Sequence, residues 1–579
     1  MKRVFGYLRP YALRITLGMI IKFIGTIMDL LLPWILAYII DELVPELQQS
    51  GMYTPLFLWG GAMLLCSAVA LFGNIIANRM ASRVARNTTE RLRHDLFSRI
   101  MRLSCRQTDE FTIPSLESRL TTDTYNVHQM LGMMQRLGIR APILLTGGVM
   151  VTWKLEPVLT LVLLSVLPLI GFTVYCISRK GVPLYTELQR SVDRMVRKVR
   201  ESASGIRVIK ALSKTNFEKA SFEAVNNEVV AKETRAATTM ATSNPLMNLF
   251  LNLGLTLVIV VGAFRVNDGL TKPGTIIAFL SYFTIILNAM LSITRMFVMY
   301  SKGSASAGRI CEVLDTPEDL LLLPADMNQP AEREHVVFEH VSFSYSGRTG
   351  TLHDIHFSLK RGETLGIIGA TGSGKSTLLR LLLRFYDPDK GEIRIAGRDV
   401  RSIPPEKLYQ KFGVAFQHDF LFADSIAENI RFGRALSDEE LAAAAADAQA
   451  APFIEELADG YSHLLTARGT NLSGGQKQRL LIARALADTP EILLLDDSSS
   501  ALDYATDARL RQAIRARGCG ATTILVAQRV SSIRHADHIL ILENGRMLGY
   551  GTHEELLRSC ASYREIAQSQ MGAGGEDIA

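Results

Sequence analysis

The sequence predicts an α-helical transmembrane domain followed by an α/β domain, and two observations carry this prediction. Hydrophobic residues make up 48% of the chain while charged residues still make up 21%, a balance that suits neither a purely soluble nor a purely membrane-embedded class. The long apolar segments lie before about residue 300, whereas a glycine-rich motif that opens at Gly369 lies after it. We therefore expect two unlike halves within the 579 residues.

The bulk composition argues against some other classes. The net charge of +6 is small for this length, so its placement along the chain matters more than its size. The six cysteines are scattered without paired spacing, so we expect neither a disulfide framework nor a cysteine zinc site. No cleavable signal peptide is expected, because the first apolar segment is long and lacks a small-residue cleavage site.

Six apolar segments are candidate transmembrane helices, because a bilayer core needs about 20 residues of helix. They are residues 15–40, 55–77, about 130–153, 157–178, 245–264 and 275–294. The segment from Asp41 to Tyr53 carries no Lys or Arg, whereas eight arginines crowd residues 79–106. The excess of positive charge in cytosolic loops then places both termini and the long loops 79–125 and 179–243 in the cytosol. Nucleic-acid binding by the basic run is the alternative, which its position next to the membrane disfavours.

The two long loops keep helical periodicity and are too long for simple turns, so we expect them to extend the spans far into the cytosol. Each has a possible reversal, near residues 111–119 and 204–210. Such tips could dock on a cytosolic domain and transmit motion to the membrane.

Lys22 and Asp29 are ionisable residues inside the first span. Seven residues apart, they lie on nearly one face of a helix. Ionisable groups in a bilayer face a cavity or a partner, so two interpretations stay open: they line a substrate cavity, or they pair with groups on neighbouring helices.

Residues 369–376, GATGSGKS, fully match the phosphate-loop pattern G-x-x-x-x-G-K-[ST]. An apolar run that predicts a strand precedes the motif, and a run that predicts a helix follows it. Glycines let successive N–H groups point at phosphate oxygens, Lys375 would reach the β- and γ-phosphates, and the Ser376 hydroxyl would hold Mg²⁺. The predicted nucleotide-binding residues are Gly369, Thr371, Gly372, Ser373, Gly374, Lys375, Ser376 and Thr377.

Two further segments support a P-loop ATPase domain. The apolar run from Glu491 to Asp496 ends in an acidic residue. A carboxylate is needed at this position to hold Mg²⁺ through its water shell. The Ser-Gly-Gly turn within 471–476 precedes a predicted helix and offers another anion-binding N-terminus. Tyr345, shortly before the phosphate loop, is either a stacking partner for a nucleotide base or a plain core aromatic.

The apolar pattern is lost over residues 301–333, which indicates a domain boundary. We therefore expect a transmembrane domain with long cytosolic extensions over 1–310 and a linker over 311–333. A nucleotide-binding domain over 334–570 and a disordered tail over 571–579 follow.

These motifs together resemble those of ATP-binding-cassette (ABC) transporters. The run 472–476, LSGGQ, resembles the family signature, Gln417 its Q-loop residue, residues 500–503 its D-loop and Tyr345 its base-stacking aromatic. With six spans ahead of the cassette, the resemblance covers nearly the whole chain and indicates a half-transporter of the exporter class. It implies that ATP lies between the phosphate loop of one chain and the signature of another, and that the tips near 111–119 and 205–210 are coupling helices. The residues it assigns are Leu472, Ser473, Gly474, Gly475 and Gln476 acting in trans, Ser500, Ala501, Leu502 and Asp503 in the D-loop, and Ser376, Gln417 and Asp496 around Mg²⁺.

Two departures from the family pattern fall at catalytic positions. Asp497 stands where the family carries a catalytic Glu, and Gln528 where it carries a switch His. Asp is one methylene shorter than Glu, and Gln cannot supply a cationic contact to the γ-phosphate. Because positioning errors near 1 Å can cost about 10²-fold, slow hydrolysis is expected at this phosphate loop. His535 is in the wrong register to substitute, and Ala467 replaces a usual acidic residue.

The intact signature beside a weakened catalytic position resembles the degenerate-site subunit of heterodimeric bacterial multidrug exporters. This implies ATP-driven export of amphipathic small molecules, lipids or peptides, with a second half-transporter chain as partner, in the plasma membrane of a bacterium. Two alternatives stay open: a slow homodimer in which Asp497 serves as base, and an ATP-gated channel or sensor that does not pump. The predicted spans exclude a soluble nucleic-acid ATPase.

Overall fold

The computed structural model describes residues 1–50, 52–324, 334–345, 350–417, 420–498, 500–516 and 520–571. They form two compact units. A helical unit comprises Met1–Met101 and Ile113–Thr316, and an α/β unit comprises Arg102–Thr112 and Pro317–Ala579. The predicted linker over 311–333 begins within a helix and ends outside the described residues. The predicted tail over 571–579 also lies outside the described residues, apart from Met571.

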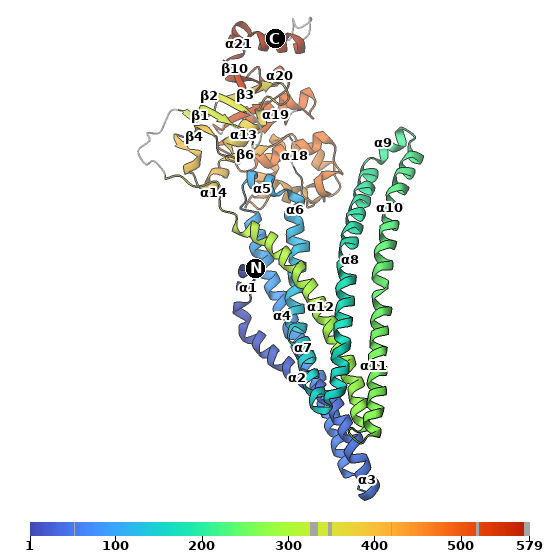
Figure 1. The fold of residues 1–579 in the computed structure, drawn as a ribbon. Helices are drawn as coiled ribbons and strands as arrows, with labels where there is room; N and C mark the ends of the chain where they lie inside the picture. The colour runs from blue at the N-terminus through green and yellow to red at the C-terminus, as the bar shows by residue number, and fades with distance from the viewer. Residues whose placement is uncertain are drawn as a thin grey trace. The chain divides into compact units, whose positions relative to one another are not determined.

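Long helices build the helical unit (Figure 1). They are α2 (Ala12–Tyr38), α4 (Thr54–Ile100), α7 (Thr124–Leu155), α8 (Pro157–Ser204), α10 (Thr215–Ala241), α11 (Ser243–Asn267) and α12 (Pro273–Asp315). Short helices accompany them: α1 (Lys2–Gly6), α3 (Val44–Ser50), α6 (Ile113–Ser118) and α9 (Ile206–Ala211). Helix α2 packs against α4, α7 against α12, and α8 against α10 and α11. The predicted reversal near 204–210 is formed by α9.

Five helical runs among the described residues are long and apolar enough to cross a membrane. They are Arg3–Leu47, Thr54–Ile100, Pro157–Ser204, Thr215–Asn267 and Pro273–Asp315. The sequence predicted a sixth span over about 130–153, which lies on α7. Arg136, Arg140 and Lys154 lower the apolar character of that helix, so the sixth span stays a prediction.

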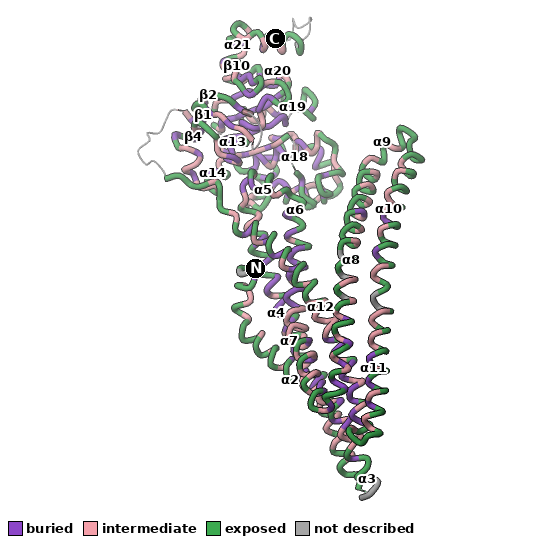
Figure 2. Tube along the Cα trace, viewed as in Figure 1, coloured by how far each residue is buried: buried purple, intermediate pink, exposed green. Residues whose placement is uncertain are grey.

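Large apolar side chains are exposed along the first half of α4. Phe57, Leu64 and Phe72 are 77%, 75% and 62% exposed. A protein surface in water rarely presents so continuous an apolar face, whereas lipid accepts it at no cost. The buried positions of this unit instead gather where α4, α7 and α12 pack (Figure 2). The fully buried Tyr282 of α12 donates a hydrogen bond of 2.6 Å to the backbone oxygen of Leu30 on α2.

Two sheets form the α/β unit. The larger has the strand order β10-β9-β3-β8-β7-β6, with parallel pairing throughout except for the β9–β10 hairpin. Its strands are β3 (Thr364–Gly369), β6 (Phe412–Ala415), β7 (Ile492–Asp496), β8 (Thr522–Val526), β9 (His538–Glu543) and β10 (Arg546–Gly551). Every residue of β7 and β8 is buried, as expected for parallel strands covered on both faces.

The smaller sheet is antiparallel, with the order β2-β1-β4-β5. Its strands are β1 (Glu334–Phe343), β2 (Leu352–Lys360), β4 (Lys390–Ile395) and β5 (Arg398–Asp399). The helices of the unit are α5 (Cys105–Phe111), α13 (Lys375–Leu382), α14 (Pro405–Tyr409), α15 (Ile426–Arg431), α16 (Asp438–Asp447), α17 (Ala451–Glu455), α18 (Gly474–Leu486), α19 (Tyr504–Ala516), α20 (Val530–Ile533), α21 (His553–Ser559) and α22 (Ala561–Met571).

The short helix α5 follows α4 in the chain but packs within the α/β unit. Ser104 and Gln107 cap its N-terminus reciprocally. The Asp109 carboxylate accepts a hydrogen bond of 2.7 Å from the Tyr386 hydroxyl, and burial together with this carboxylate raises the pKa of Tyr386. The predicted reversal near 111–119 is thus formed by α5 and α6, and α5 is anchored by side-chain hydrogen bonds.

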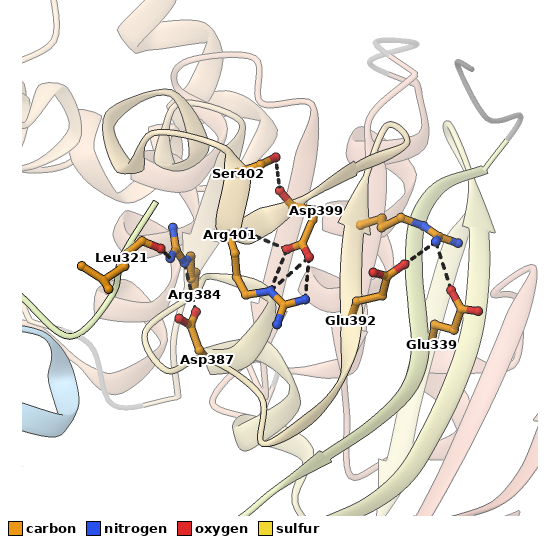
Figure 3. Close-up of polar contacts among 9 residues, drawn as sticks. Leu321, Glu339, Arg384, Asp387, Glu392, Asp399, Arg401 and Ser402 are labelled. Carbon is orange, nitrogen blue, oxygen red and sulfur yellow. Dashed lines mark hydrogen bonds and ion pairs between the residues drawn. The ribbon is translucent and has the colours of Figure 1, made fainter. Parts of the chain in front are cut away.

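The segment that follows α12 is held to the α/β unit by a buried arginine (Figure 3). Arg384, with 2% of its surface exposed, donates to the backbone oxygen of Leu321 at 2.6 Å and to Asp387 at 3.0 Å. Nearby, Arg401 forms a forked pair with Asp399. A buried guanidinium needs such partners, and here the hydrogen bond to Leu321 holds the segment that directly follows α12.

Candidate nucleotide-binding site

A cavity of about 280 Å³ opens at the carboxyl ends of β3, β7 and β8. Ligands bind at this edge in open α/β sheets because the loops that follow parallel strands converge there. Eleven residues predicted from the sequence line it: Tyr345, Thr371, Gly372, Gly374, Lys375, Ser376, Thr377, Gln417, Asp496, Asp497 and Gln528. Segments more than 180 residues apart in the chain therefore meet as the motifs predicted.

The phosphate loop joins β3 to α13 through left-handed backbone. Gly374, the residue before α13, has a φ of 103°, and a Cβ there would lie 2.5 Å from the Leu352 side chain. Only glycine meets both conditions without strain. The predicted residues Gly369 and Ser373 do not line the cavity; Ser373 is buried, and its Oγ has no hydrogen-bond partner within the part of the chain that the structure describes.

Lys375 folds back over the loop that carries it. Its Nζ donates to the backbone oxygens of Gly369 and Ala370, each at 2.8 Å. Burial lowers the pKa of Lys375, while the carboxylates of Asp496 and Asp497 oppose that shift. The ammonium is therefore held at the cavity wall, where phosphate oxygens would give it further acceptors.

Asp496 ends β7 with only 5% of its surface exposed. Burial raises the pKa of this carboxyl, and a hydrogen bond with Ser376 opposes the shift. A buried carboxylate beside a hydroxyl and the Gln417 amide oxygen is a set of hard oxygen donors, which is what Mg²⁺ prefers. Ser376, Gln417 and Asp496 thus fit the magnesium site that the sequence predicted.

Asp497 lies one residue beyond β7 with a φ of 49° and 6% exposure. Its Oδ2 accepts two hydrogen bonds, from Gln528 Nε2 at 2.7 Å and from Gln417 Nε2 at 3.1 Å. Burial raises the pKa of Asp497, and the Gln528 hydrogen bond opposes this. The two residues that depart from the family pattern therefore contact each other.

Tyr345 stands at the rim of the cavity, two residues after β1. Its ring packs edge-on against Phe343 and Tyr386, and its hydroxyl accepts a hydrogen bond of 3.2 Å from Arg380. The ring is thus held by aromatic neighbours, and the residue is part of the cavity lining. Both predicted roles, stacking on a base and packing in the core, are compatible with this position.

The signature residues lie outside this cavity. Ser473 caps α18 and exchanges hydrogen bonds with Gln476, whose side-chain oxygen accepts from the Ser473 N–H at 2.9 Å. A Cβ on Gly475 would lie 3.2 Å from the backbone oxygen of Ala501, so the signature turn abuts the D-loop. In the D-loop, Leu502 is buried and the Asp503 carboxylate caps α19 through Thr506.

Two residues that line the cavity were not predicted from the sequence. Thr351 precedes β2, and Val526 is the last residue of β8. The apolar run that ends at Val526 could have identified it, since the carboxyl end of a parallel strand meets the phosphate loop; Thr351 carries no comparable signal. His535 lines a separate cavity of about 370 Å³ with Gly362 and Thr364, in agreement with its predicted exclusion from the site.

Lys22 and Asp29 belong to α2 of the helical unit and each has a partner on a neighbouring helix. The buried Lys22 donates to Asn78 Oδ1 at 3.0 Å, and Asp29 pairs with Arg140 of α7 at 3.1 Å. These contacts satisfy the polar groups within the protein and support the structural-pairing alternative.

Comparison with known proteins assigns both units to one family. The model of the ABC transporter transmembrane region matches residues 15–290, and the ABC transporter model matches residues 352–500. The chain is 34% identical over 579 residues to the uncharacterized ABC transporter ATP-binding protein YfiB of Bacillus subtilis (strain 168), with 100% of both chains covered. It is 31% identical to the putative ABC transporter ATP-binding protein exp8 of Streptococcus pneumoniae serotype 4, over 100% of this chain and 98% of that protein.

Among solved structures, the chain is similar to a bacterial Atm1-family ABC exporter with ATP bound. The TM-score is 0.81 at 27% sequence identity, over 98% of this chain and 99% of that one. The match extends through both units, so the helical unit is a transmembrane domain of the exporter type and the α/β unit is an ABC ATPase domain. The chain belongs to the ABC transporter family and is a half-transporter of the exporter type.

Proposed function

We propose that this half-transporter works in a heterodimer in which its own phosphate loop binds ATP and Mg²⁺ but hydrolyses ATP slowly. The observation that supports this is the pair of amide hydrogen bonds to Oδ2 of Asp497. A general base must present a lone pair to the attacking water, and here two amides donate to the same carboxylate oxygen, Oδ2 of Asp497. The amide of Gln528 is also neutral, so it supplies no charge to a γ-phosphate.

Burial acts in the opposite direction, because it raises the pKa of Asp497 and so makes the carboxylate more basic. This observation favours a second candidate, a slow homodimer in which Asp497 is the base. The shorter side chain favours the heterodimer, because a carboxylate misplaced by about 1 Å can cost about 10²-fold in rate and a higher basicity does not correct its position. We therefore place the heterodimer first.

The signature of this chain would complete the partner's site. The signature sequence is intact, and its residues do not line this chain's own nucleotide cavity. Ser473 and Gly474 are exposed. The N-terminus of α18 carries positive partial charge, and the backbone N–H groups at a helix N-terminus suit a γ-phosphate. Hydrolysis would then occur mainly on the partner's phosphate loop, against this chain's LSGGQ.

At this chain's own site, Lys375 and the loop backbone would bind the phosphates, and Tyr345 would orient the base. Ser376, Gln417 and Asp496 would hold Mg²⁺, which spreads the negative charge of the phosphates when bound. Binding without turnover would keep the two cassettes together while the other site cycles, which fits a regulatory role for this site.

We further propose that the transported compound is amphipathic, a drug-like molecule, a lipid or a peptide, and that the protein resides in a bacterial plasma membrane with its ATPase domain in the cytosol. The arginine-rich stretch that follows the second span supports this orientation. The exposed apolar face of α4 supports contact with lipid.

Native mass spectrometry of the tagged chain, extracted from its own membranes in mild detergent, tests the heterodimer. The proposal predicts a complex of one 64.0 kDa chain with one different half-transporter. A complex of two copies of this chain that hydrolyses ATP would favour the homodimer instead.

A further inference from the structure

Two complementary β-bulges distort the pairing of β1 with β2. Phe338 pairs with Phe357 and Val341 pairs with Ile355, so two residues of β1 face one residue of β2 between these pairs. Beyond Val341 the excess reverses, because the next pair joins Phe343 to Leu352. Bulges of this kind re-aim side chains and occur often beside functional sites.

The bulged residues are His340 on β1 and Asp354 on β2, and both adopt left-handed backbone, with φ of 50° and 52°. Such a conformation is costly for residues other than glycine, and it persists where the surroundings enforce it. Gly391 of β4 makes room for it: a Cβ there would lie 2.5 Å from the backbone oxygen of His340. The strain is thus accommodated by the neighbouring strand.

Both bulges aim their side chains at the same point as His356 of β2. His340 Nδ1 lies 2.6 Å from Asp354 Oδ1, and the two imidazole rings lie 5.4 Å apart between centroids. One ligand atom from each of the three residues lies within 4.8 Å of the other two. All three residues are exposed, so the cluster is open to ions from solvent.

We propose that His340, Asp354 and His356 form a binding site for a divalent transition-metal ion, with Zn²⁺, Cu²⁺ or Ni²⁺ as its ligand class. Two imidazole nitrogens and one carboxylate oxygen suit these borderline ions, whereas Mg²⁺ and Ca²⁺ prefer oxygen alone. A tetrahedral zinc site with bonds of about 2.0–2.1 Å separates its ligand atoms by about 3.3 Å. Exposed side chains can reach this spacing by rotation.

A contact to a backbone oxygen, which is not one of the proposed ligand atoms, supports the assignment. His356 Nδ1 lies 3.2 Å from the backbone oxygen of Asp354. Metal-binding histidines commonly donate one ring N–H to a carbonyl, which fixes the tautomer and leaves the other nitrogen for the metal. In His356 that leaves Nε2 as the ligand atom. A bound ion would tie β1 to β2 across both bulges and stabilise the antiparallel sheet.

The test is a zinc titration of the tag-free full-length protein in lipid nanodiscs, first stripped of metal with a chelator and without nucleotide. Calorimetry should show one high-affinity equivalent per chain that His340→Ala and His356→Ala each remove, with a loss beyond the about 10–100-fold typical of changes outside the ligand set. His94→Ala is the matched control, because His94 is an exposed histidine next to a carboxylate, Asp95, outside the proposed site. It should keep the equivalent.

Cu²⁺, added at a concentration that also loads the weakened variants, provides a second readout: the number of coordinated imidazoles rather than the affinity. Its electron paramagnetic resonance spectrum should show coupling to two imidazole nitrogens in the unmodified chain and to one in either histidine variant. Absence of a high-affinity equivalent for all three ions would overturn the proposal. An equivalent retained in both histidine variants would overturn it as well.

Discussion

The Gln528 side-chain amide donates a hydrogen bond of 2.7 Å to Oδ2 of Asp497, and the two residues follow neighbouring parallel strands, β8 and β7. Both positions are occupied by other residue types in the family pattern, so the contact is specific to this pair. It holds the carboxylate against an amide at the point where hydrolysis needs a free base. The following predictions start from this contact and from the cavity around it.

The double variant Asp497→Glu, Gln528→His should raise ATP hydrolysis at this site by up to about 10²-fold, because the longer carboxylate regains its reach and the imidazole can carry charge. Single-turnover hydrolysis of radiolabelled ATP measures the change. Asp497→Glu alone is the control, because it lengthens the carboxylate side chain without adding the imidazole that can carry charge. An unchanged rate in the double variant would mean that other features of the site prevent hydrolysis.

Lys375→Ala and Ser473→Ala should separate the two roles of this chain in its native complex. Lys375 lines this chain's own cavity, so its loss should weaken nucleotide binding here by at least about tenfold and leave much of the ATPase of the complex intact. Binding of a fluorescent ATP analogue and steady-state ATPase measure the two effects.

Ser473→Ala should do the opposite, because Ser473 caps α18 outside this chain's cavity. The ATPase of the complex should fall sharply while nucleotide binding at this chain's phosphate loop is retained. If both variants lowered the ATPase equally, the asymmetric scheme would be contradicted.

Asp496→Asn should raise the melting temperature of the nucleotide-free protein while abolishing Mg²⁺-dependent ATP binding. Burial raises the pKa of Asp496, so the folded state binds this proton more tightly than the unfolded chain. The contribution of this carboxyl to stability is therefore fully present at low pH and is lost as pH rises from the ordinary pKa of an aspartate through the raised value. The difference in melting temperature between the Asn variant and the unmodified protein should grow over the same pH interval, as differential scanning fluorimetry would show. A lower melting temperature at neutral pH would contradict this.

The Asp29–Arg140 pair should behave as a structural contact between α2 and α7. Asp29→Ala and Arg140→Ala should each lower thermal stability in detergent, because either change leaves a charge without its partner in an apolar domain. The exchanged variant Asp29→Arg, Arg140→Asp should recover part of the loss. Unchanged stability together with altered transport selectivity would favour the cavity-lining alternative.

The nucleotide cavity was predictable because its chemistry is encoded in contiguous motifs. Residues 364–376 specify a strand, a left-handed turn and a helix N-terminus by their own sequence, and Asp496 is the last residue of a fully buried strand. The contact between Asp497 and Gln528 was not predictable, since it depends on the parallel register of β7 with β8 across 31 residues of chain.

Other features depend on tertiary context. The sequence assigned Cys105–Phe111 to a loop between spans, but its place in the α/β unit depends on contacts such as Asp109 with Tyr386, 277 residues apart. The bulges at His340 and Asp354 interrupt the alternation of β1 and β2 with two consecutive exposed residues each, but the positive φ could not be predicted, because at a non-glycine residue it is imposed by the neighbouring strand. The sixth span stays a prediction, since Arg136 and Arg140 lower the apolar character of α7, and the contact of Arg140 with Asp29 could not be read from the sequence.

The Mg²⁺-dependent ATPase rate of this chain purified alone in lipid, at saturating ATP, tests the degenerate site most directly. A turnover far below the about 1–10² s⁻¹ that is ordinary for enzymes is the result that the Asp497–Gln528 contact predicts, with full activity appearing only when the partner chain is added. A turnover within that range for the isolated chain would contradict the account and establish Asp497 as a working base in a homodimer.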